Sequence, residues 1–404
     1  MANSDKSQSF FRRQWMLLAS LAAIIALFIL VVVATVFTTR KSKQPVVEQP
    51  GQARLPADVI GNPDVDPGSS AGDMAAPGFV LRDQRGRLTS LKQFRGKVVV
   101  LAFIDSHCTT ICPLTTESMV EALRLLGPAA SQVQLLGINA NPLATRIADV
   151  AGYTRAHQMQ GRWRFLTGSL PQLERVWHGY HVYVAAVHND IDHNPIVFLI
   201  GPRGHERTIY LTQMSYEGVA QQAQLLAEGI ARLLPHHPPV RHEVSLRYLP
   251  PFKPTETVRL SAFGSHGPVV VFGPAHPCLL LFFAGWLRED VNLRARLDAL
   301  NAYAATARRR GWPLPVAVNE LPTEASPAAA RKLLSGLSTT LHAPIVEDSD
   351  GRLADGYGVQ GLPWFVLCSP SGRILWHHSG WLSPAALIHH VHAALAKSQH
   401  ASAA

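Results

Sequence analysis

The sequence predicts an α/β protein in which two tandem globular domains follow an N-terminal transmembrane helix. A chain of 404 residues is long enough for two or three domains that each bury a core. An uncharged apolar stretch lies near the N-terminus, and two later blocks each alternate buried strands with helical segments, the pattern of an α/β fold. The predicted division is an N-terminal segment, a membrane anchor, a flexible tether, a first domain, a linker rich in Pro and His, a second domain and a tail, at residues 1–14, 15–37, 38–75, 76–234, 235–243, 244–396 and 397–404.

Charge and cysteine content exclude two classes of protein. The formal net charge is +9, but the 37 Lys and Arg residues are spread along the chain, with no dense block outside the N-terminal region. This pattern argues against a nucleic-acid-binding surface and suits anionic lipid or an acidic partner. Four cysteines are too few for a disulfide-built scaffold, so hydrophobic cores must supply the stability.

The predicted anchor is Trp15–Phe37, which carries no charged side chain. As a helix rising ~1.5 Å per residue, it is long enough to cross a ~30 Å hydrocarbon core. Its apolar run is longer than that of a secretory signal, which favours an uncleaved anchor, while cleavage near Val32–Ala34 stays open. Basic residues flank both ends, so charge alone does not orient the helix. Since the globular mass follows the helix, we expect a bacterial inner-membrane anchor with both domains in the periplasm.

The segment after the anchor is predicted to be a tether. Residues 44–76 are rich in Pro, Gly, Gln and Asp and lack an apolar period. This composition favours a flexible tether over the alternative, an ordered arm wrapped around the domain. Pro77–Leu88 then alternates apolar and polar residues about an Arg-Gly turn, which predicts a hairpin.

The first domain is organised around Val98–Pro113. Its first seven residues are apolar and mostly β-branched, which predicts a strand buried on both faces. Cys108 and Cys112 follow where the strand must turn into a helix, and Pro113 suits the first helical turn. The positive end of the helix dipole lowers the pKa of thiols at such a place. Thiolates four residues apart can share a metal ion or close a disulfide, and inert buried cysteines are the alternative.

The order of the later elements brings one histidine towards these cysteines. Those elements are predicted at residues 133–138, 147–157, 163–166, 170–179, 196–200, 208–211 and 216–234, the order of a thioredoxin-like α/β domain. In such a domain the strand before the cysteine turn neighbours the strand after His193, so His193 faces Cys108 and Cys112. Two thiolates and one imidazole suit Cu(I) and can also hold Cu(II), whereas a packing histidine is the alternative. His107 adjoins Cys108 but is expected to point away.

Several motifs of the first domain occur together in one known family. They are Pro77–Leu81, Gly96–Lys97, Cys108-x-x-x-Cys112-Pro113, Trp163–Gly168, Asp192–His193 and Phe198–Pro202. These motifs resemble the Sco/SenC family, membrane-anchored copper chaperones with a thioredoxin fold. The resemblance covers residues 76–234 and implies that Cys108, Cys112 and His193 bind one copper ion per chain. It also implies service to the copper A centre of cytochrome c oxidase. The implied partners are the copper subunit of that or another respiratory oxidase and periplasmic copper donors.

The sequence departs from this family at three places. Asn141 and Ala144 stand where the family usually carries aspartates, Thr110–Ile111 replaces a frequent Asp-Val, and Pro195 replaces an aliphatic residue. We expect copper binding to survive these changes, which bear more on the recognition of the usual partner.

The second domain repeats this design without its cysteines. Leu279–Trp286 is again a buried strand, and Gly358–Pro363 precedes a strand–turn–strand unit like that of the first domain. These features resemble TlpA-like thioredoxins, whose corresponding loop holds a cis-proline, here Pro363. Where a redox thioredoxin has Cys-x-x-Cys, this chain has Leu287–Asp290. Dithiol exchange at that position is therefore impossible, and we expect a redox-dead docking module.

Cys278 and Cys368 are the other two cysteines of the chain. They are predicted to lie opposite each other on antiparallel strands, with Cα atoms roughly 4.5–5.5 Å apart. An oxidising compartment would permit a structural disulfide between them, while a pair of reduced buried thiols is the alternative.

Two functions use Cys108 and Cys112. The leading prediction is a copper-binding assembly factor, a metallochaperone rather than a true enzyme. The alternative is a periplasmic thiol–disulfide oxidoreductase in which Cys108 and Cys112 form the redox-active pair. The four-residue spacing and His193 favour the metal. A copper-independent scaffold with two interaction modules is a third possibility.

Overall fold

The computed structural model describes residues 59, 61–188, 190–264, 267–289 and 292–403, and they belong to one compact unit, Leu55–Ala404. The predicted anchor and most of the predicted tether lie outside the described residues. Within the described ranges, no helix is both long enough and apolar enough to cross a membrane.

A mixed sheet of eight strands, in the order β1-β10-β9-β4-β5-β6-β2-β3, forms the first domain. Its central strand β4 (Val98–Ile104) is parallel to β5 (Val133–Asn139) and antiparallel to β9 (Ile196–Ile200). The predicted adjacency of the strand before the cysteines and the strand after His193 is therefore confirmed. The other strands are β1 (Ser69–Ser70), β2 (Val80–Asp83), β3 (Leu88–Ser90), β6 (Trp163–Thr167) and β10 (Glu206–Leu211).

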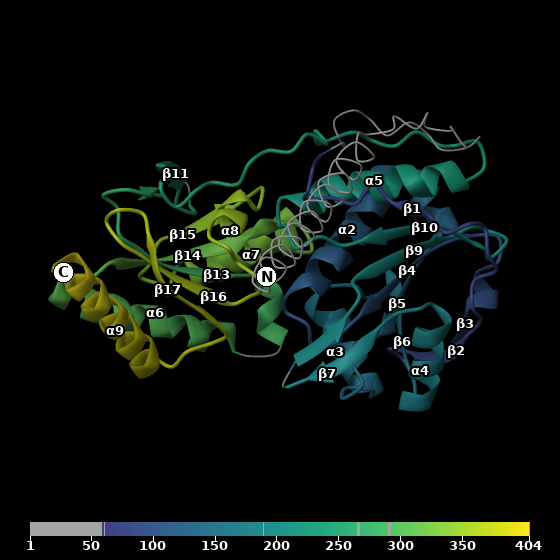
Figure 1. Ribbon diagram of the computed structural model, residues 1–404, viewed down its shortest axis with the longest axis horizontal. Coiled ribbons are helices and arrows are strands. Elements are labelled where there is room, and N and C mark those ends of the chain that lie inside the picture. Colours follow the sequence, from purple (N-terminus) through teal and green to yellow (C-terminus); the bar gives the residue numbers. More distant parts are fainter. Residues whose placement is uncertain (1–58, 60, 189, 265–266, 290–291, 404) are drawn as a thin grey trace, which may run out of the picture. The chain divides into compact units, whose positions relative to one another are not determined.

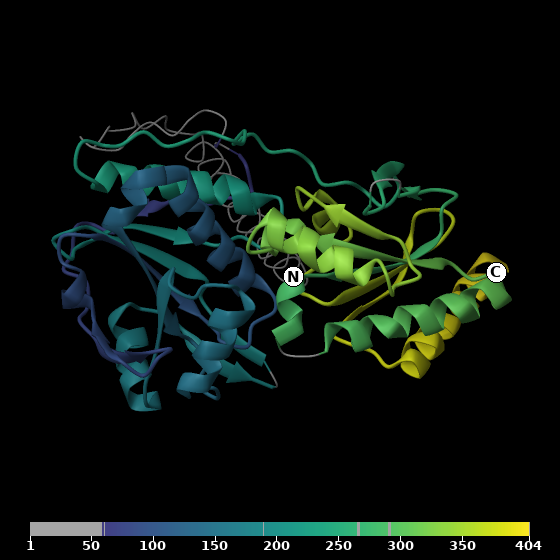
Figure 2. The same ribbon diagram turned by 180° about the vertical axis from the view of Figure 1, so that it is seen from behind.

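Both faces of this sheet are covered, because all seven residues of β4 are buried and alternate between two cores. Helices α2 (Ile111–Leu126), α3 (Ile147–Ala156) and α5 (Gly218–Leu233) pack on one face. Helix α4 (Leu170–Gly179) packs on the other, as Figures 1 and 2 show. Short 3₁₀ turns lie at Leu91–Phe94 and Gly127–Gln132, and a separate hairpin pairs β7 (Val184–Val187) with β8 (Asp190–His193).

The second sheet has five strands in the order β15-β14-β13-β16-β17. Its strands are β13 (Cys278–Phe283), β14 (Leu314–Glu320), β15 (Ile345–Asp348), β16 (Trp364–Cys368) and β17 (Ile374–Ser379). Strands β13, β14 and β15 are mutually parallel, and β16 runs antiparallel to both β13 and β17. The five strands β6-β5-β4-β9-β10 of the first sheet have the same order and the same directions.

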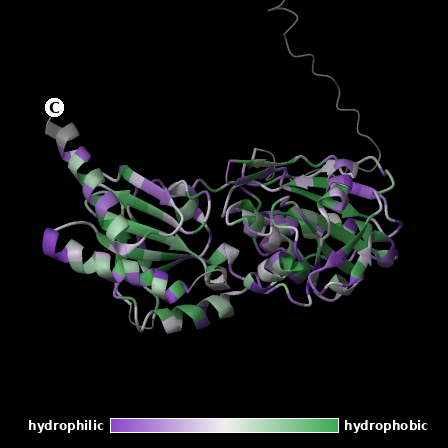
Figure 3. Ribbon diagram, turned by 90° about the horizontal axis from the view of Figure 1, so that it is seen from below, coloured by the Kyte–Doolittle hydropathy of each residue, from purple (hydrophilic) through white to green (hydrophobic). Residues whose placement is uncertain are grey.

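Helices cover this second sheet as well. They are α6 (Leu293–Arg310), α7 (Pro327–Leu337), α8 (Arg352–Gly356) and α9 (Pro384–Ala403). Helices α6 and α9 pack together, and the strands between the helices carry mostly hydrophobic side chains (Figures 1 and 3). A hairpin of β11 (Val258–Ser261) and β12 (Val269–Phe272) precedes the sheet, and 3₁₀ turns lie at Gly285–Glu289 and Leu321–Thr323.

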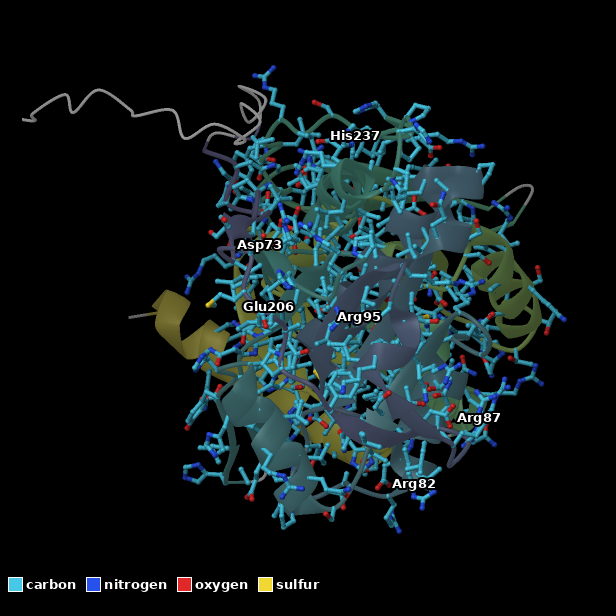
Figure 4. The ribbon with its side chains drawn as sticks, turned by 90° about the vertical axis from the view of Figure 1, so that its right-hand side faces the viewer. Asp73, Arg82, Arg87, Arg95, Glu206 and His237 are labelled. Atoms are coloured by element: carbon cyan, nitrogen blue, oxygen red, sulfur yellow. The ribbon has the colours of Figure 1, made fainter. Side chains whose placement is uncertain are left out.

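The prediction of a flexible tether is wrong for residues 61–75, which form an ordered arm on the first domain. The Asn62 amide donates hydrogen bonds to Gln221 Oε1 (2.8 Å) and the Leu246 carbonyl oxygen (2.9 Å). Further along, Asp73 pairs with Arg207 of β10 (2.9 Å), and Figure 4 labels Asp73 and Glu206, the first residue of that strand. Polar residues that the composition assigned to solvent thus find partners on the folded domain.

The linker also differs from its predicted bounds. Leu246 is buried in a small cluster with residues of the arm and α5, and Gln221 donates to the Ser245 carbonyl oxygen (2.9 Å). The segment 245–247 therefore packs on the first domain, and the next strand begins only at Val258.

Of the two alternatives for Cys278 and Cys368, the structure has the free thiols rather than the disulfide. The register that pairs Leu279 with Leu367 does place the two cysteines opposite each other, as predicted. Both are buried and free, and a hydrogen bond joins their side chains. The pair packs in the core of the second domain as small hydrophobic side chains.

Candidate metal and thiol site

The candidate site lies where β4 turns into α2. Strand β4 ends at Ile104, and α2 begins at Ile111 with Thr110 as its N-cap residue. Cys108 is half-buried in the connecting turn, whereas Cys112 is buried in the first turn of α2. The strand ends where Asp105 and the polar residues after it form a turn, in which the Cys108 amide donates to the Asp105 carbonyl oxygen. We call residues 105–112 the cysteine turn.

Hydrogen bonds order the two thiols. The Cys112 backbone amide donates to Cys108 Sγ over 3.4 Å, and Thr110 Oγ1 lies 3.2 Å from the same sulfur. These donors and the Cys112 side chain lower the pKa of Cys108, with the Cys112 side chain as the largest cause. Burial raises the pKa of Cys112 well above its usual value, and the neighbouring Cys108 adds to this effect. The two thiols therefore differ in acidity, and Cys108 loses its proton more readily than Cys112.

His193 completes this group from the last residue of β8. Its Nε2 atom lies 3.6 Å from Cys112 Sγ, and its Nδ1 atom lies 3.1 Å from the carbonyl oxygen of Asn194. A carbonyl oxygen only accepts, so Nδ1 carries the proton and the lone pair of Nε2 faces the sulfur. Burial lowers the pKa of His193, which favours the neutral imidazole that a metal ion requires.

The structure thus brings Cys108, Cys112 and His193 together, but as a hydrogen-bonded group. In the part of the chain that the structure describes, no set of three or more His, Cys, Asp and Glu side chains has the arrangement of a formed metal site. The donor types nevertheless fit a soft metal ion, because His193 Nε2 lies 3.6 Å from Cys112 Sγ and the Cys112 amide lies 3.4 Å from Cys108 Sγ.

Asp105 supports the cysteine turn, and sequence reasoning missed it. Its Oδ1 atom accepts hydrogen bonds from the His107 amide (2.8 Å) and from Nδ2 of Asn141 (2.6 Å), and its carbonyl oxygen accepts from the Cys108 amide (3.2 Å). An acidic residue directly after a fully buried strand was the available signal. Asn141, one of the departures from the Sco/SenC pattern, is the amide partner of this carboxylate.

Two other residues singled out from the sequence are His107, within the cysteine turn, and Pro363 of the second domain. His107 points away from the cysteines, with Nε2 3.7 Å from Asp149. The Leu362–Pro363 peptide bond is cis, and the Leu362 amide donates to the carbonyl oxygen of Thr109 over 3.0 Å. The loop of the second domain therefore contacts the cysteine turn of the first, which sequence reasoning did not anticipate.

A large cleft lies elsewhere in the molecule. It has a volume of about 1480 Å³, and its lining includes Glu117, Arg162 and Tyr216 but neither cysteine of the turn nor His193. The chemistry of the thiols and the imidazole, rather than the size of a cavity, marks the candidate site.

Comparison with known proteins supports the same region. The SCO1/SenC family model matches residues 68–228. The chain is 32% identical over 154 residues to the protein SCO2 homolog, mitochondrial, of Bos taurus, covering 36% of this chain and 57% of that protein. It is 25% identical over 133 residues to the SCO1 protein homolog of Bacillus subtilis, covering 31% of this chain and 68% of that protein. The chain thus spans less than two thirds of the length of the bovine relative.

One solved structure that resembles part of this chain is that of Bradyrhizobium japonicum ScoI with copper bound. It is 23% identical and has a TM-score of 0.34, with 40% of this chain and 99% of that chain covered. The region that the family model matches holds the central strand β4, the cysteine turn and His193. Residues 68–228 of this chain thus match the SCO1/SenC family model.

Proposed function

We propose that this protein binds one copper ion per chain and serves as a copper chaperone in the assembly of a respiratory oxidase. The observation that carries the proposal is the meeting of Cys108, Cys112 and His193 at one turn of a SCO1/SenC domain. In this proposal copper is the cargo of the protein rather than a permanent cofactor.

The chemistry of the three donors supports copper. Thiolates are soft ligands that select Cu(I), and an imidazole nitrogen makes the set competent for Cu(II). Hydrogen bonds lower the pKa of Cys108, and His193 presents an unprotonated Nε2. Binding must displace the proton of Cys112, so copper uptake releases a proton to solvent.

The proposed setting follows from the N-terminal sequence. We place the two domains in the periplasm of a bacterium, tethered to the inner membrane by Trp15–Phe37, which carries no charge. The client in this proposal is the copper A subunit of cytochrome c oxidase or of another respiratory oxidase, and periplasmic copper donors load the protein. The second domain is proposed to be a thioredoxin-like docking module, supported by the strand order that it shares with the first.

Anaerobic titration of the reduced full chain with Cu(I), against a competing chelator, tests this proposal. We expect one Cu(I) per chain, and loss of that ion in the Cys108→Ser/Cys112→Ser variant. The matched control is Cys278→Ser/Cys368→Ser, which removes two buried thiols of the second domain and retains the copper. Stoichiometric binding that persists without Cys108 and Cys112 would end the proposal.

The closeness of the two cysteines, with the Cys112 amide 3.4 Å from Cys108 Sγ, favours a second candidate function, thiol–disulfide exchange, and the lowered pKa of Cys108 supports it. The Cys108 thiolate would attack a client disulfide, and Cys112 would then resolve the mixed disulfide. Two electrons pass to the client, which leaves as a dithiol, and Cys108 and Cys112 end as a disulfide. Single-turnover reduction of a model disulfide by the copper-free, reduced chain tests this function separately from copper binding.

A further inference from the structure

The second domain contacts the cysteine turn directly. The Leu362 amide donates a 3.0 Å hydrogen bond to the Thr109 carbonyl oxygen. A methyl group on the neighbouring Gly361 would lie 2.8 Å from Cγ2 of Thr110 and 3.2 Å from the Thr109 oxygen. Thr110 is itself the residue whose hydroxyl lies 3.2 Å from Cys108 Sγ. Thr110 therefore lies in space between Gly361 of the second domain and the Cys108 sulfur.

Two further contacts show that this approach belongs to a built interface. The Trp286 ring packs against the buried His157 of the first domain, with ring centroids 4.8 Å apart. At another part of the interface, the Asp355 carboxylate accepts hydrogen bonds from the Tyr216 amide (2.9 Å), the Glu217 amide (3.0 Å) and the Ser215 hydroxyl (2.9 Å). A carboxylate with three donors, all supplied by the other domain, holds the two domains in one orientation.

Apolar side chains join the two domains as well. Leu114 of α2, Ala156 of α3, and Tyr216 and Val219 near the start of α5 belong to the same hydrophobic cluster as the core of the second domain. Burial of apolar surface supplies most of the free energy of such contacts, and the polar contacts fix the register.

The two loops that contact the cysteine turn occupy equivalent positions in the two sheets. His193 lies just before β9, and Leu362 lies just before β16, which is the equivalent strand of the second sheet. The cysteine turn is thus contacted by the same loop of both domains. The second domain cannot exchange electrons with the turn there, because Leu287–Asp290 contains no thiol.

We infer that the second domain is a built-in partner of the cysteine turn, in which Gly361 and Leu362 position Cys108 and cover the Thr109–Thr110 side of the turn. The inference rests on the proposed function in that it concerns the same cysteines. A client protein reaches this side of the turn only when the second domain moves away. The contact therefore limits both the reaction of Cys108 with other molecules and the rate at which cargo leaves it.

Alkylation of the reduced, metal-free full chain, with all four cysteines resolved by peptide mass mapping, tests the inference. Gly361→Val introduces a side chain where the loop meets Thr110, and Asp355→Ala removes the carboxylate at the other contact. We expect Cys108 to be labelled about fivefold or more faster in both variants, because each releases the loop from the turn. Gly336→Val is the matched control, since no atom lies within 4 Å of a methyl group at that exposed position.

Cys278 and Cys368 report whether the second domain stays folded, since both are buried in its core. Faster labelling of Cys108, with these two still protected, supports the inference. Unchanged labelling of Cys108 in both variants would overturn it. If a variant exposes Cys278 and Cys368, hydrogen exchange in the native chain decides, and a Leu362 amide that exchanges as fast as an unbonded amide would also overturn it. Since no copper is present, failure of the copper proposal leaves this test unaffected.

Discussion

His193 shows how one residue obtains its place in the site from local chemistry. Its Nδ1 atom is held by the carbonyl of the next residue, Asn194, so its other nitrogen must face Cys112. Such a fixed tautomer is the arrangement expected of a metal-binding histidine. His107 adjoins Cys108 in sequence but faces Asp149 instead. Position in the fold, rather than nearness in sequence, distinguishes the two histidines.

The variant His193→Ala is expected to weaken Cu(II) binding by about tenfold or more while Cu(I) stays bound by the two thiolates, because nitrogen ligands matter more to Cu(II). Competition titrations followed by optical and electron paramagnetic resonance spectra measure both affinities. His107→Ala is the control and should behave as the native chain. Cu(II) spectra that do not change in His193→Ala would remove His193 from the site.

Glu117 of α2 provides a test of pH dependence. It is buried, and in the part of the chain that the structure describes its Oε1 atom has no hydrogen-bond partner. Burial raises the pKa of Glu117 to about 8. The folded protein therefore holds a proton that the unfolded chain loses above its ordinary pKa of 4.5. The contribution of the protonated Glu117 carboxyl to the free energy of unfolding is complete below pH 4.5 and is lost as the pH rises through about 8.

We therefore expect Glu117→Gln to match the native chain in free energy of unfolding near pH 4. At pH 9 the variant should exceed the native chain by roughly 2–4 kcal/mol. Denaturant unfolding at a series of pH values measures the difference, with the exposed Glu174→Gln as control. A native chain whose stability runs parallel to that of Glu117→Gln over this range would show that the Glu117 carboxyl is not held neutral.

The sequence predicts which residues supply the thiols and the imidazole of the site, but not which residues hold them in place. The sequence could predict that His193 lies near Cys108 and Cys112, because strand order determines where loops meet. The contact of Asp105 with Asn141 could not be predicted, because it depends on the directions of two side chains that follow different strands. The same holds for Leu362 and Thr109, whose hydrogen bond depends on how two domains pack.

At the scale of elements, apolar patterns predicted most of the fold. Strand β4 and helices α3 and α4 were recognised within one residue, because continuous apolar runs and helical periods rarely arise outside strands and helices. The arm at residues 61–75 was missed, because its binding energy comes from polar groups whose partners are remote in sequence. The Asn62 amide, for example, donates to Gln221 of α5 and to the carbonyl oxygen of Leu246.

Asn62→Ala tests the contribution of this arm. The substitution removes two hydrogen bonds and leaves the Gln221 amide oxygen without the Asn62 donor. We expect the free energy of unfolding to fall by about 1–3 kcal/mol. We also expect proteolysis within residues 61–75 to become faster. Gln213→Ala, which removes a hydrogen bond to the carbonyl oxygen of the exposed Leu211, is the control. An unchanged cleavage rate in Asn62→Ala would show that the arm does not depend on this contact.

At the scale of the whole molecule, one strand order carries two different chemistries. The first domain has thiols at its strand–helix turn, and the second has Leu287–Asp290 at the equivalent place. The remaining thiols, Cys278 and Cys368, are buried in the core of the second domain. Any thiol chemistry of the chain is therefore expected to depend on the first domain alone.

The full-length Cys108→Ser/Cys112→Ser variant should accordingly show no disulfide reductase activity in an insulin-reduction assay. The activity of the native chain, where present, should be retained in Cys278→Ser/Cys368→Ser. Residual activity in the Cys108→Ser/Cys112→Ser variant would show that the buried pair reaches substrate.

X-ray absorption spectroscopy of the chain loaded with one equivalent of Cu(I) tests whether Cys108, Cys112 and His193 bind copper, because it identifies the ligand atoms of the ion. We expect two sulfur scatterers from Cys108 and Cys112 and one nitrogen scatterer from His193, with the nitrogen lost in His193→Ala. A first shell without sulfur, or one that is unchanged when both Cys108 and Cys112 are replaced by Ser, would contradict this expectation.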